Sequence, residues 1–481
     1  MRGTVFLVMV MGLLLMAGCG GGGNSDNSTP TDPGGSTGGG ASGGGSTDTD
    51  DSCGASAQID FVQEVTDSWY LWYDEMASVS KSDYDDPEAY LDALLAPMAA
   101  DGRDPGFSFL TTITEDEARF TSGAYIGFGF RYTVTDADQF LMIDVFESGP
   151  AYAAGFRRGW ELVAVDTGSG FETMESLVDR GASSEEVFGA SELGVERGFR
   201  LVKEDEVLEV VVAKEELDPP ALVDAPLLIT RSGNTPVGYL NLRQFILSAN
   251  DPLTAASLAL KEAGVTDLVV DLRYNGGGLL SVADNMMDLL GGTAADGELA
   301  FQLAHNDKHA DENARQQGFF DELAESVGLL RIAFITTGSS ASASELVINS
   351  LAPHIEVVLV GSDTYGKAVG QYGFDLDGCD VRLRLVAFEI VNGEGQGGYY
   401  TGLYDTGRFT LCSAGDDYFR PFGDPEEASL KSALGWLNSG ACPSSAGASA
   451  LKSLRTRDRS GDPAWWRRAE WQPDGTDPFS K

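Results

Sequence analysis

The chain has 481 residues, of which 42% are hydrophobic and 22% are charged. This composition is ordinary for a globular protein and excludes a wholly disordered or fibrous chain. Asp and Glu number 74 against 32 Lys and Arg, which gives a net charge of -42. A chain this acidic repels phosphate backbones and anionic lipid headgroups, so we expect no binding to nucleic acid.

Residues 1–18 are predicted to be a signal peptide. Arg2 precedes an apolar run over residues 4–17, which is too short to span a bilayer. The run ends in Met16-Ala17-Gly18-Cys19, which resembles a bacterial lipoprotein cleavage box with Cys19 as the lipidated residue. An ordinary secretory signal is the alternative. We therefore expect a protein of the bacterial cell envelope that contacts the membrane only through its Cys19 lipid, on the outer membrane and facing the periplasm or the cell surface.

Residues 19–56 are predicted to be a flexible tether that follows the lipidated Cys. The stretch 20–52 contains only Gly, Ser, Thr, Asn, Asp, Pro and Ala, so it cannot bury a core. Four further cysteines suggest two disulfides in an exported protein. Three pairings are open, and we interpret them as Cys379 with Cys412 and Cys53 with Cys442.

Residues 57–122 are predicted to form a helical region. Apolar residues recur at three- and four-residue spacing over 59–72, and a second such pattern covers 90–95. The aromatic residues between 69 and 73 could form a binding surface. A stripe of this kind is more often part of a core, and we expect these side chains to be buried.

Residues 123–217 are predicted to form a β-rich domain, because short β-rich runs at 140–146, 162–165 and 207–212 alternate with Gly-rich turns. The order of Tyr125-Ile126-Gly127-Phe128-Gly129-Phe130, Ser148-Gly149-Pro150-Ala151, Ala154-Gly155 and Gly159-Trp160-Glu161-Leu162 resembles a PDZ domain. Gly127, Phe128, Gly129 and Phe130 match its carboxylate-binding loop. Backbone N–H groups there would receive a peptide's terminal carboxylate, and the Phe side chains would line a pocket for an apolar last residue. The alternative is a Gly-rich hairpin without a ligand.

Residues 218–444 are predicted to form an α/β domain. Strands expected at 237–242, 268–273, 330–336, 355–360 and 381–391 alternate with helices expected at 252–263, 281–290 and 344–351. The strand at 381–391 could belong to a meander, which would make the sheet mixed. Catalytic groups should lie where strands lead into helices. Residues 445–481 are interpreted as a polar C-terminal tail, although its Arg and Trp residues could bind a partner.

The first candidate segment for chemistry is Asp271-Leu272-Arg273-Tyr274-Asn275-Gly276-Gly277-Gly278, in which a buried strand runs into three glycines. Glycines permit a close approach of ligand to backbone, and their N–H groups can face a developing oxyanion. No Lys follows them, so this is not a phosphate-binding P-loop. A tight turn without a ligand is the alternative.

The second candidate segment is Ser339-Ser340-Ala341-Ser342-Ala343-Ser344-Glu345, between a buried strand and a helix. A hydroxyl at a helix N-terminus has backbone N–H groups beside it, but it needs a base. His305 and His309 lack the Glu of a metalloprotease motif and are interpreted as part of a polar surface segment. His354 is interpreted as a helix-end residue.

Lys367 is the candidate base. It follows Ser342 by 25 residues, after one helix and one strand, so the chain can return to the same sheet edge. Burial would lower its pKa toward neutrality, so that it can take the Ser proton and pass it to the leaving amine. Gln371 lies four residues further on and could hold the amine by a hydrogen bond.

These segments resemble the carboxyl-terminal processing (tail-specific) peptidases over residues 57–440. The resemblance implies a helical N-terminal region, a PDZ-like domain and an α/β protease core of the crotonase/ClpP type. It implies Ser342 as nucleophile, Lys367 as general base and Gln371 as its orienting partner. It also implies an oxyanion hole from the N–H of Ala343 with that of Gly276 or Gly277. Ala368 and Tyr274 depart from the family pattern, which bears on substrate preference.

The sequence thus predicts a serine endopeptidase that cuts exported proteins near apolar C-terminal tails through an acyl-enzyme, with no metal or organic cofactor. Gating by the PDZ-like domain or a regulatory partner is left open. A non-catalytic tail- or ligand-binding lipoprotein on the same scaffold is the second reading. A coenzyme-A enzyme on a crotonase-like scaffold is the third, disfavoured by the signal peptide and the PDZ-like segment.

Overall fold

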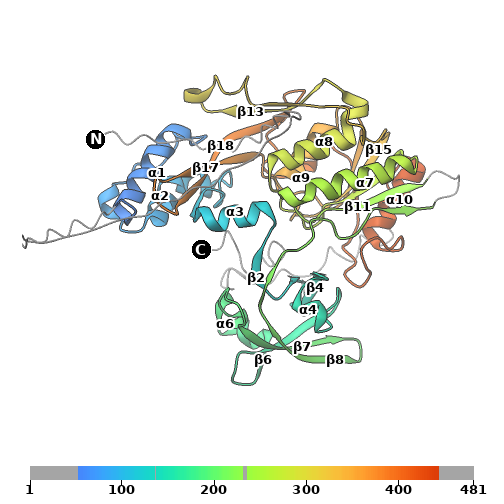
Figure 1. The fold of residues 1–481 in the computed structure, drawn as a ribbon, viewed down its shortest axis with the longest axis horizontal. Helices are drawn as coiled ribbons and strands as arrows, with labels where there is room; N and C mark the ends of the chain where they lie inside the picture. The colour runs from blue at the N-terminus through green and yellow to red at the C-terminus, as the bar shows by residue number, and fades with distance from the viewer. Residues whose placement is uncertain (1–51, 136, 231–235, 444–481) are drawn as a thin grey trace, which may run out of the picture.

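The computed structural model describes residues 52–135, 137–230 and 236–443. The predicted signal peptide, Cys19, nearly all of the tether and the C-terminal tail lie outside these described residues. The described part is a mixed α/β protein with a helical N-terminal region, as the sequence predicts (Figure 1).

A six-stranded sheet forms the centre of the core. It is parallel except at the edge strand β10, which runs antiparallel to β11. The strands, in spatial order, are β10 (Leu227–Ile229), β11 (Val237–Asn241), β12 (Asp267–Asp271), β15 (Arg331–Thr336), β16 (Glu356–Gly361) and β19 (Leu411–Ser413). Strands buried on both faces read as continuous apolar runs, which is why these segments could be recognised in the sequence.

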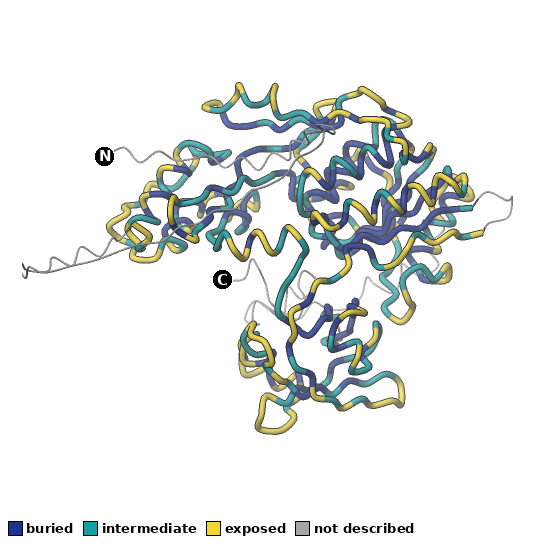
Figure 2. Tube along the Cα trace, viewed as in Figure 1, coloured by how far each residue is buried: buried dark blue, intermediate teal, exposed yellow. Residues whose placement is uncertain are grey.

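Helices cover both faces of this sheet. The faces alternate along each strand with a period of two: Leu268 and Val270 pack on one side, and Val269 packs on the other. The first side is covered by α7 (Asn250–Glu262), α8 (Leu280–Ala295) and α9 (Ala343–Leu351), and the second by α10 (Ala428–Ser439). Figure 2 shows the strands as the most continuous buried part of the molecule.

A second sheet is antiparallel and packs against the N-terminal helices. Its strands are β1 (Phe109–Thr111), β18 (Arg382–Asn392), β13 (Leu299–His305) and β14 (Gln317–Phe319), with β17 (Val369–Asp375) also paired to β18. The strand expected at 381–391 is β18, so it lies in this sheet and not in the parallel one. Its pairing with β17 through a short turn accounts for the difference, since such a hairpin is antiparallel.

The N-terminal region contains α1 (Ala55–Trp69), α2 (Pro87–Ala100) and α3 (Ile113–Thr121). Helix α2 begins where Asp86 accepts the N–H of Glu88, with Pro87 at the first helical position. Of the aromatic residues at 69–73, Tyr70 is fully buried, whereas Trp69, Trp72 and Tyr73 are partly buried against the same cluster. Short 3-10 turns are η1 (Lys81–Asp83), η2 (Leu247–Ala249), η3 (Asp307–His309) and η4 (Tyr404–Thr406).

A β-rich unit lies below the core in Figure 1. Its main sheet contains β3 (Phe130–Val134), β4 (Phe140–Val145), β5 (Glu161–Asp166), β7 (Glu196–Lys203) and β8 (Glu206–Ala213), with β6 (Phe171–Thr173) paired to β5. Its helices are α4 (Pro150–Ala153), α5 (Met174–Asp179) and α6 (Ser184–Phe188). The chain enters and leaves through an antiparallel pair, β2 (Tyr125–Gly127) and β9 (Glu215–Leu217). A buried ion pair between Asp144 and Arg243, 2.8 Å apart, joins the unit to the core.

The two disulfides are Cys53–Cys379 and Cys412–Cys442. The predicted pairing of Cys379 with Cys412 and Cys53 with Cys442 is therefore wrong. Cys412 lies in β19 of the parallel sheet, directly under α10, whose chain continues to Cys442. Cys379 lies instead at the turn of the β17–β18 hairpin, beside the start of α1. The spacing of the cysteines along the chain does not reveal that Cys379 and Cys412 lie in different parts of the fold.

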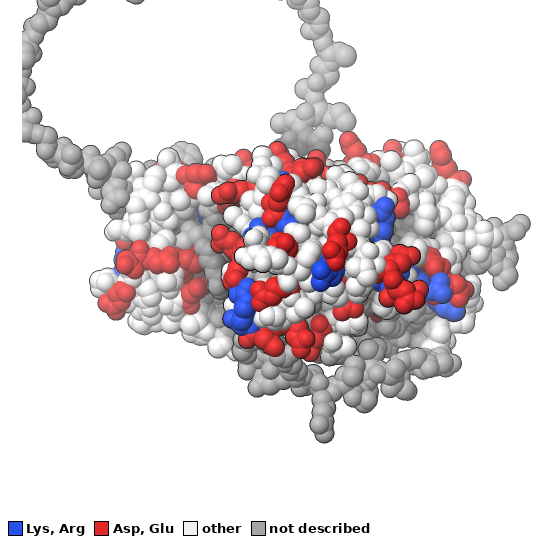
Figure 3. Space-filling view, turned by 90° about the horizontal axis from the view of Figure 1, so that it is seen from below, with Lys and Arg blue, Asp and Glu red and all other residues white. Residues whose placement is uncertain are grey.

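Acidic side chains are spread over the face of the molecule seen in Figure 3, with basic side chains scattered between them. This agrees with the net charge of -42. Among the described residues, no helix has both the length and the apolar character needed to cross a membrane.

Candidate active site

The glycine and serine segments meet at one edge of the parallel sheet. The glycine segment follows β12 and the serine segment follows β15, and these strands are adjacent and parallel, with Asp271 opposite Ile335. Because the carboxyl ends of parallel strands share an edge, the two loops lie side by side. From the sequence we expect catalytic groups where strands lead into helices. The shared edge of the parallel sheet is the physical reason for that expectation.

Hydrogen bonds hold the two loops together, including one from the Thr337 hydroxyl to the Arg273 carbonyl. Ser340 donates its hydroxyl to the Leu272 carbonyl at 2.8 Å, and Ser344 donates to the Asn275 carbonyl at 2.9 Å. The Ala341 N–H donates to the same Asn275 oxygen at 3.1 Å. The hydroxyls of Ser340 and Ser344 therefore bond to the backbone of the glycine loop, whereas the Ser342 side chain accepts the backbone N–H of Glu345 in a capping box at the start of α9.

Ser342 lies immediately before α9 in a strained conformation, with φ 55° and ψ -114°. A non-glycine residue with positive φ is costly and persists only where its surroundings enforce it, most often at functional sites. Gly277 is packed directly against it: a Cβ on Gly277 would lie 2.8 Å from Ser342 Cβ. Only glycine at position 277 lets the two loops approach this closely.

Lys367 lies in the segment between β16 and β17 and is 8% exposed. Its Nζ donates to Gln371 Oε1 at 2.8 Å and lies 4.5 Å from the centre of the Phe107 ring. Burial lowers the pKa of the Lys367 amine to about 8, against the opposing attraction of the Asp104 carboxylate. An amine with this pKa is partly neutral near neutral pH, as a general base requires.

Glu345 connects the two candidate catalytic residues and was not singled out from the sequence. Its Oε2 accepts the backbone N–H groups of both Ser342 and Lys367 at 2.9 Å, and its Oε1 accepts that of Gly366 at 2.8 Å. The carboxylate is completely buried, and burial raises its pKa to about 7.

The candidate oxyanion donors differ in whether their N–H groups already donate a hydrogen bond within the protein. The Gly277 N–H donates to Asn275 Oδ1 at 2.9 Å. For the N–H groups of Gly276 and Ala343, no acceptor is found in the part of the chain that the structure describes. Gly276 and Ala343 are therefore the pair that can face a developing negative charge.

The loop bearing the glycines is also anchored by a buried charge network. Arg273 is 2% exposed and pairs with Asp271, Asp416 and Glu427 at 2.8 to 3.0 Å. Tyr274 donates its hydroxyl to Asp416 and accepts from Arg158 of the β-rich unit. Tyr274 thus contacts the β-rich unit through Arg158.

The segment from Gly127 to Phe130 lies at the end of β2 and the start of β3. Phe128 and Phe130 are fully buried in the core of the β-rich unit, where both pack against Phe199. Gly129, with φ 90°, lies against Gly149. The expected pocket lining by the two Phe rings is therefore not seen, since their side chains fill the core.

The histidines are structural. His305 belongs to β13, is 9% exposed and contacts Asn313 and the Tyr372 hydroxyl, so its interpretation as a surface residue is wrong. His309 stacks on Trp69 with ring centres 3.5 Å apart. His354 packs against Phe320. The described residues contain no group of three His, Cys, Asp or Glu side chains arranged to hold a metal ion.

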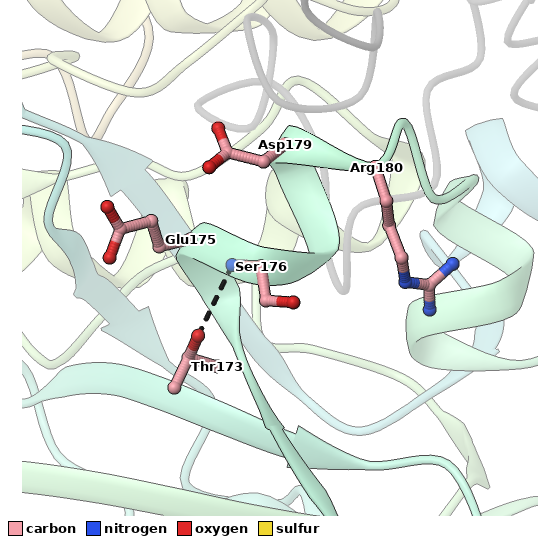
Figure 4. Close-up of a pocket in the computed structure, with 5 residues that line it drawn as sticks. All are labelled: Thr173, Glu175, Ser176, Asp179 and Arg180. Carbon is pink, nitrogen blue, oxygen red and sulfur yellow. Dashed lines mark hydrogen bonds between the residues drawn. The ribbon is translucent and has the colours of Figure 1, made fainter.

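Three surface hollows are lined by neither Ser342 nor Lys367. The one in Figure 4, of about 410 Å³, lies along α5 of the β-rich unit. Thr173 caps that helix by accepting the Ser176 N–H, and Arg180 pairs with Glu172 and Glu186 nearby. The lining includes no nucleophile paired with a base, since Ser176 and Arg180 bond to Glu172, so the candidate active site rests on the Ser342 geometry.

Comparisons with known proteins place parts of this chain beside one peptidase family. Residues 236–402 match the model of peptidase family S41, and residues 57–109 match the peptidase S41 N-terminal domain. A carboxyl-terminal-processing protease of Picosynechococcus is 25% identical over 56% of this chain and 61% of its own length. A Staphylococcus aureus protein named as a probable CtpA-like serine protease is 28% identical over 61% of this chain and 55% of its own. The chain thus spans about 60% of the length of the curated relatives it matches.

A solved structure supports the same assignment. A Bacteroides fragilis protein assigned to the S41 proteases is 26% identical, with a TM-score of 0.63, over 79% of this chain and 97% of its own. The fold is that of a solved S41 protease, and residues 236–402 and 57–109 match the models of the S41 peptidase domain and its N-terminal domain. The resemblance to the carboxyl-terminal processing peptidases is thus confirmed.

Proposed function

We propose that this protein is a serine endopeptidase in which Ser342 is the nucleophile and Lys367 the general base. The single observation that carries the proposal is the Glu345 carboxylate, which accepts the backbone N–H groups of both residues. A shared buried anchor fixes a hydroxyl at a helix N-terminus beside a desolvated amine, which is the pairing that Ser–Lys chemistry requires.

In the proposed reaction, neutral Lys367 takes the Ser342 proton as Oγ attacks the scissile carbonyl. The Gly276 and Ala343 N–H groups stabilise the oxyanion, and Lys367 then delivers the proton to the leaving amine. In the second step of the reaction, water hydrolyses the acyl-enzyme and frees Ser342. Gln371 holds the amine between these steps through its 2.8 Å hydrogen bond. Rotation of the Lys367 side chain brings Nζ to Ser342 Oγ when substrate is bound.

We further propose that the β-rich unit is PDZ-like and receives the apolar C-terminal tail of an exported substrate. The backbone of residues 127–130 would meet the terminal carboxylate, as peptide addition to a sheet edge requires. The Cys19 lipid would hold the enzyme in the bacterial cell envelope. Support for the tail preference comes from the relatives named for carboxyl-terminal processing.

Cleavage of a defined peptide tests the proposal. The purified chain and its Ser342→Ala variant are incubated with a peptide ending in an apolar free carboxylate and with the same peptide amidated. Mass spectrometry should find cleavage by the parent alone and faster cleavage of the free acid. Absence of cleavage by both proteins, across several peptides between pH 6 and 9, would favour the non-catalytic binding lipoprotein. Equal cleavage of acid and amide would remove the tail-capture role of the β-rich unit.

A further inference from the structure

The turn at residues 104–108 lies in the N-terminal region between α2 and β1, and it contacts the candidate base directly. The Phe107 ring lies 4.5 Å from Lys367 Nζ, and the Phe107 carbonyl accepts a hydrogen bond from Gln371 Nε2. The Gln371 oxygen accepts the Lys367 amine at 2.8 Å. Two neighbours therefore hold opposite ends of one amide group.

The Phe107 carbonyl decides which way the Gln371 amide faces. A glutamine amide has an acceptor oxygen at one end and a donor NH2 at the other, and only the oxygen can accept from an amine. Because the Phe107 oxygen can bond only to the NH2 end, it forces the amide oxygen toward Lys367. An amide turned the other way would present hydrogens to the lysine and push its side chain out of place.

Asp104 holds this carbonyl in position. Its Oδ1 accepts the N–H groups of Phe107 at 2.8 Å and Ser108 at 3.0 Å. Its Oδ2 accepts the hydroxyls of Ser108 at 2.7 Å and Tyr70 at 3.1 Å. The carboxylate is 1% exposed, so all four donors depend on it for their partner. Ser108 Oγ in turn accepts the Val386 N–H at 3.0 Å, which ties the turn to β18.

We propose that Asp104 is a positioning residue of the active site, which acts through the Phe107 carbonyl and the Gln371 amide to keep the Lys367 amine in place. The inference rests on the proposed function and extends it to the N-terminal region, which would complete the catalytic centre of the core. Substrate need not touch Asp104 for it to affect the rate.

A positioning role has a signature in the pH profile that a purely structural role lacks. The charges facing Lys367 are the carboxylates of Asp104 and Glu345, which favour its protonated form, and the guanidiniums of Arg119 and Arg384, which disfavour it. Neutralising Asp104 removes one attraction for the ammonium. The Lys367 pKa should then fall below its present value of about 8.

The test compares Asp104→Asn with Asp101→Asn, an exposed carboxylate beside the same turn that bonds to Arg103 instead. With a peptide substrate, Asp104→Asn should lower the plateau kcat by about 10- to 100-fold, leave KM within about 3-fold and move the acid limb to lower pH. Asp101→Asn should match the parent. Thermal melting records whether each variant is folded, and Ser108→Ala, which keeps the charge, should lower kcat without moving the acid limb.

A double-mutant cycle that combines Asp104→Asn with Gln371→Glu tests whether Asp104 acts through the Gln371 amide. A carboxylate accepts from the lysine in either orientation, so Asp104→Asn should cost less activity in that background than in the parent. An unchanged plateau and acid limb in Asp104→Asn, or losses that simply add in the cycle, would overturn the inference while the parent still cleaves. If Asp104→Asn does not fold, an unchanged kcat in Ser108→Ala would overturn it. An inactive parent would instead refute the proposed function itself.

Discussion

Glu345 and Lys367 are joined by a hydrogen bond of 2.9 Å from the lysine backbone N–H to Oε2, the same oxygen that accepts the Ser342 N–H. One carboxylate thus fixes the separation of two backbones that are 25 residues apart in the chain. The relationship explains how a strained serine and a buried lysine keep their relative positions.

Replacing Glu345 by Gln should strongly impair the enzyme. Both carboxylate oxygens of Glu345 accept backbone N–H groups. A glutamine places an NH2 group, which cannot accept, at one of these two positions, so in either amide orientation a backbone N–H loses its acceptor. We expect kcat to fall about 100-fold and stability to drop by about 1–3 kcal/mol. Peptide turnover and urea unfolding measure the two effects. The exposed Glu298→Gln is the matched control, and parental kcat in Glu345→Gln would contradict the anchoring role.

Activity should rise with pH through the titration of Lys367. The base acts in its neutral form, so with a pKa of about 8 the rate increases with pH and levels off above that value. At pH 6 the rate should be about 100-fold below the plateau, and lower still as Glu345, with a pKa of about 7, takes up a proton. A series of kcat/KM values from pH 6 to 10 measures the limb. A flat profile over this range would rule out Lys367 as the base.

Gly277→Ala should abolish activity with a modest loss of stability. The new Cβ would lie 2.8 Å from Ser342 Cβ and 2.9 Å from the Ala341 carbonyl, at a residue whose φ is 103°. The two loops would have to separate, which displaces the nucleophile. Gly338→Ala is the control, because a Cβ there meets nothing within 4 Å. The turnover of Gly277→Ala should be at least about 100-fold lower than that of Gly338→Ala. Equal turnover of the two variants would show that the close contact is dispensable.

The disulfide pairing can be read directly from the oxidised protein. Peptide mapping without reductant should recover Cys53 linked to Cys379 and Cys412 linked to Cys442. Removing the second bridge by Cys412→Ser with Cys442→Ser should cost about 2–4 kcal/mol, since it closes a 30-residue loop against β19 and α10. Recovery of Cys379 joined to Cys412 would contradict the described arrangement.

Local patterns were sufficient to predict the parallel strands β11, β12, β15 and β16 and the glycine and serine loops, but not the short parallel edge strand β19. Apolar runs such as the one ending at Asp271 are buried on both faces and stand out in the sequence, and the small residues around Ser342 mark a close approach. Those signals are local, so they pointed to Ser342 as the candidate nucleophile, and the spacing to Lys367 pointed to the candidate base.

The features that could not be predicted from the sequence depend on contacts between distant segments of the chain. Asp104 reaches Gln371 only because the N-terminal turn packs on β17 and β18, and nothing in its surrounding residues marks it as different from other acidic positions. Glu345 reads as a first-turn helix residue, which is its ordinary role. The burial of His305 and the disulfide pairing likewise follow from sheet topology that no spacing rule encodes.

The most direct test of the central claim is covalent labelling of the nucleophile. The parent, Ser342→Ala and Lys367→Ala are each treated with a fluorophosphonate at pH 8.5, and intact-mass and peptide spectra locate the adduct. The account predicts one adduct on Ser342 in the parent, no adduct in Ser342→Ala and much slower labelling of Lys367→Ala. Labelling at another residue, or labelling of Ser342 at an unchanged rate without Lys367, would contradict it.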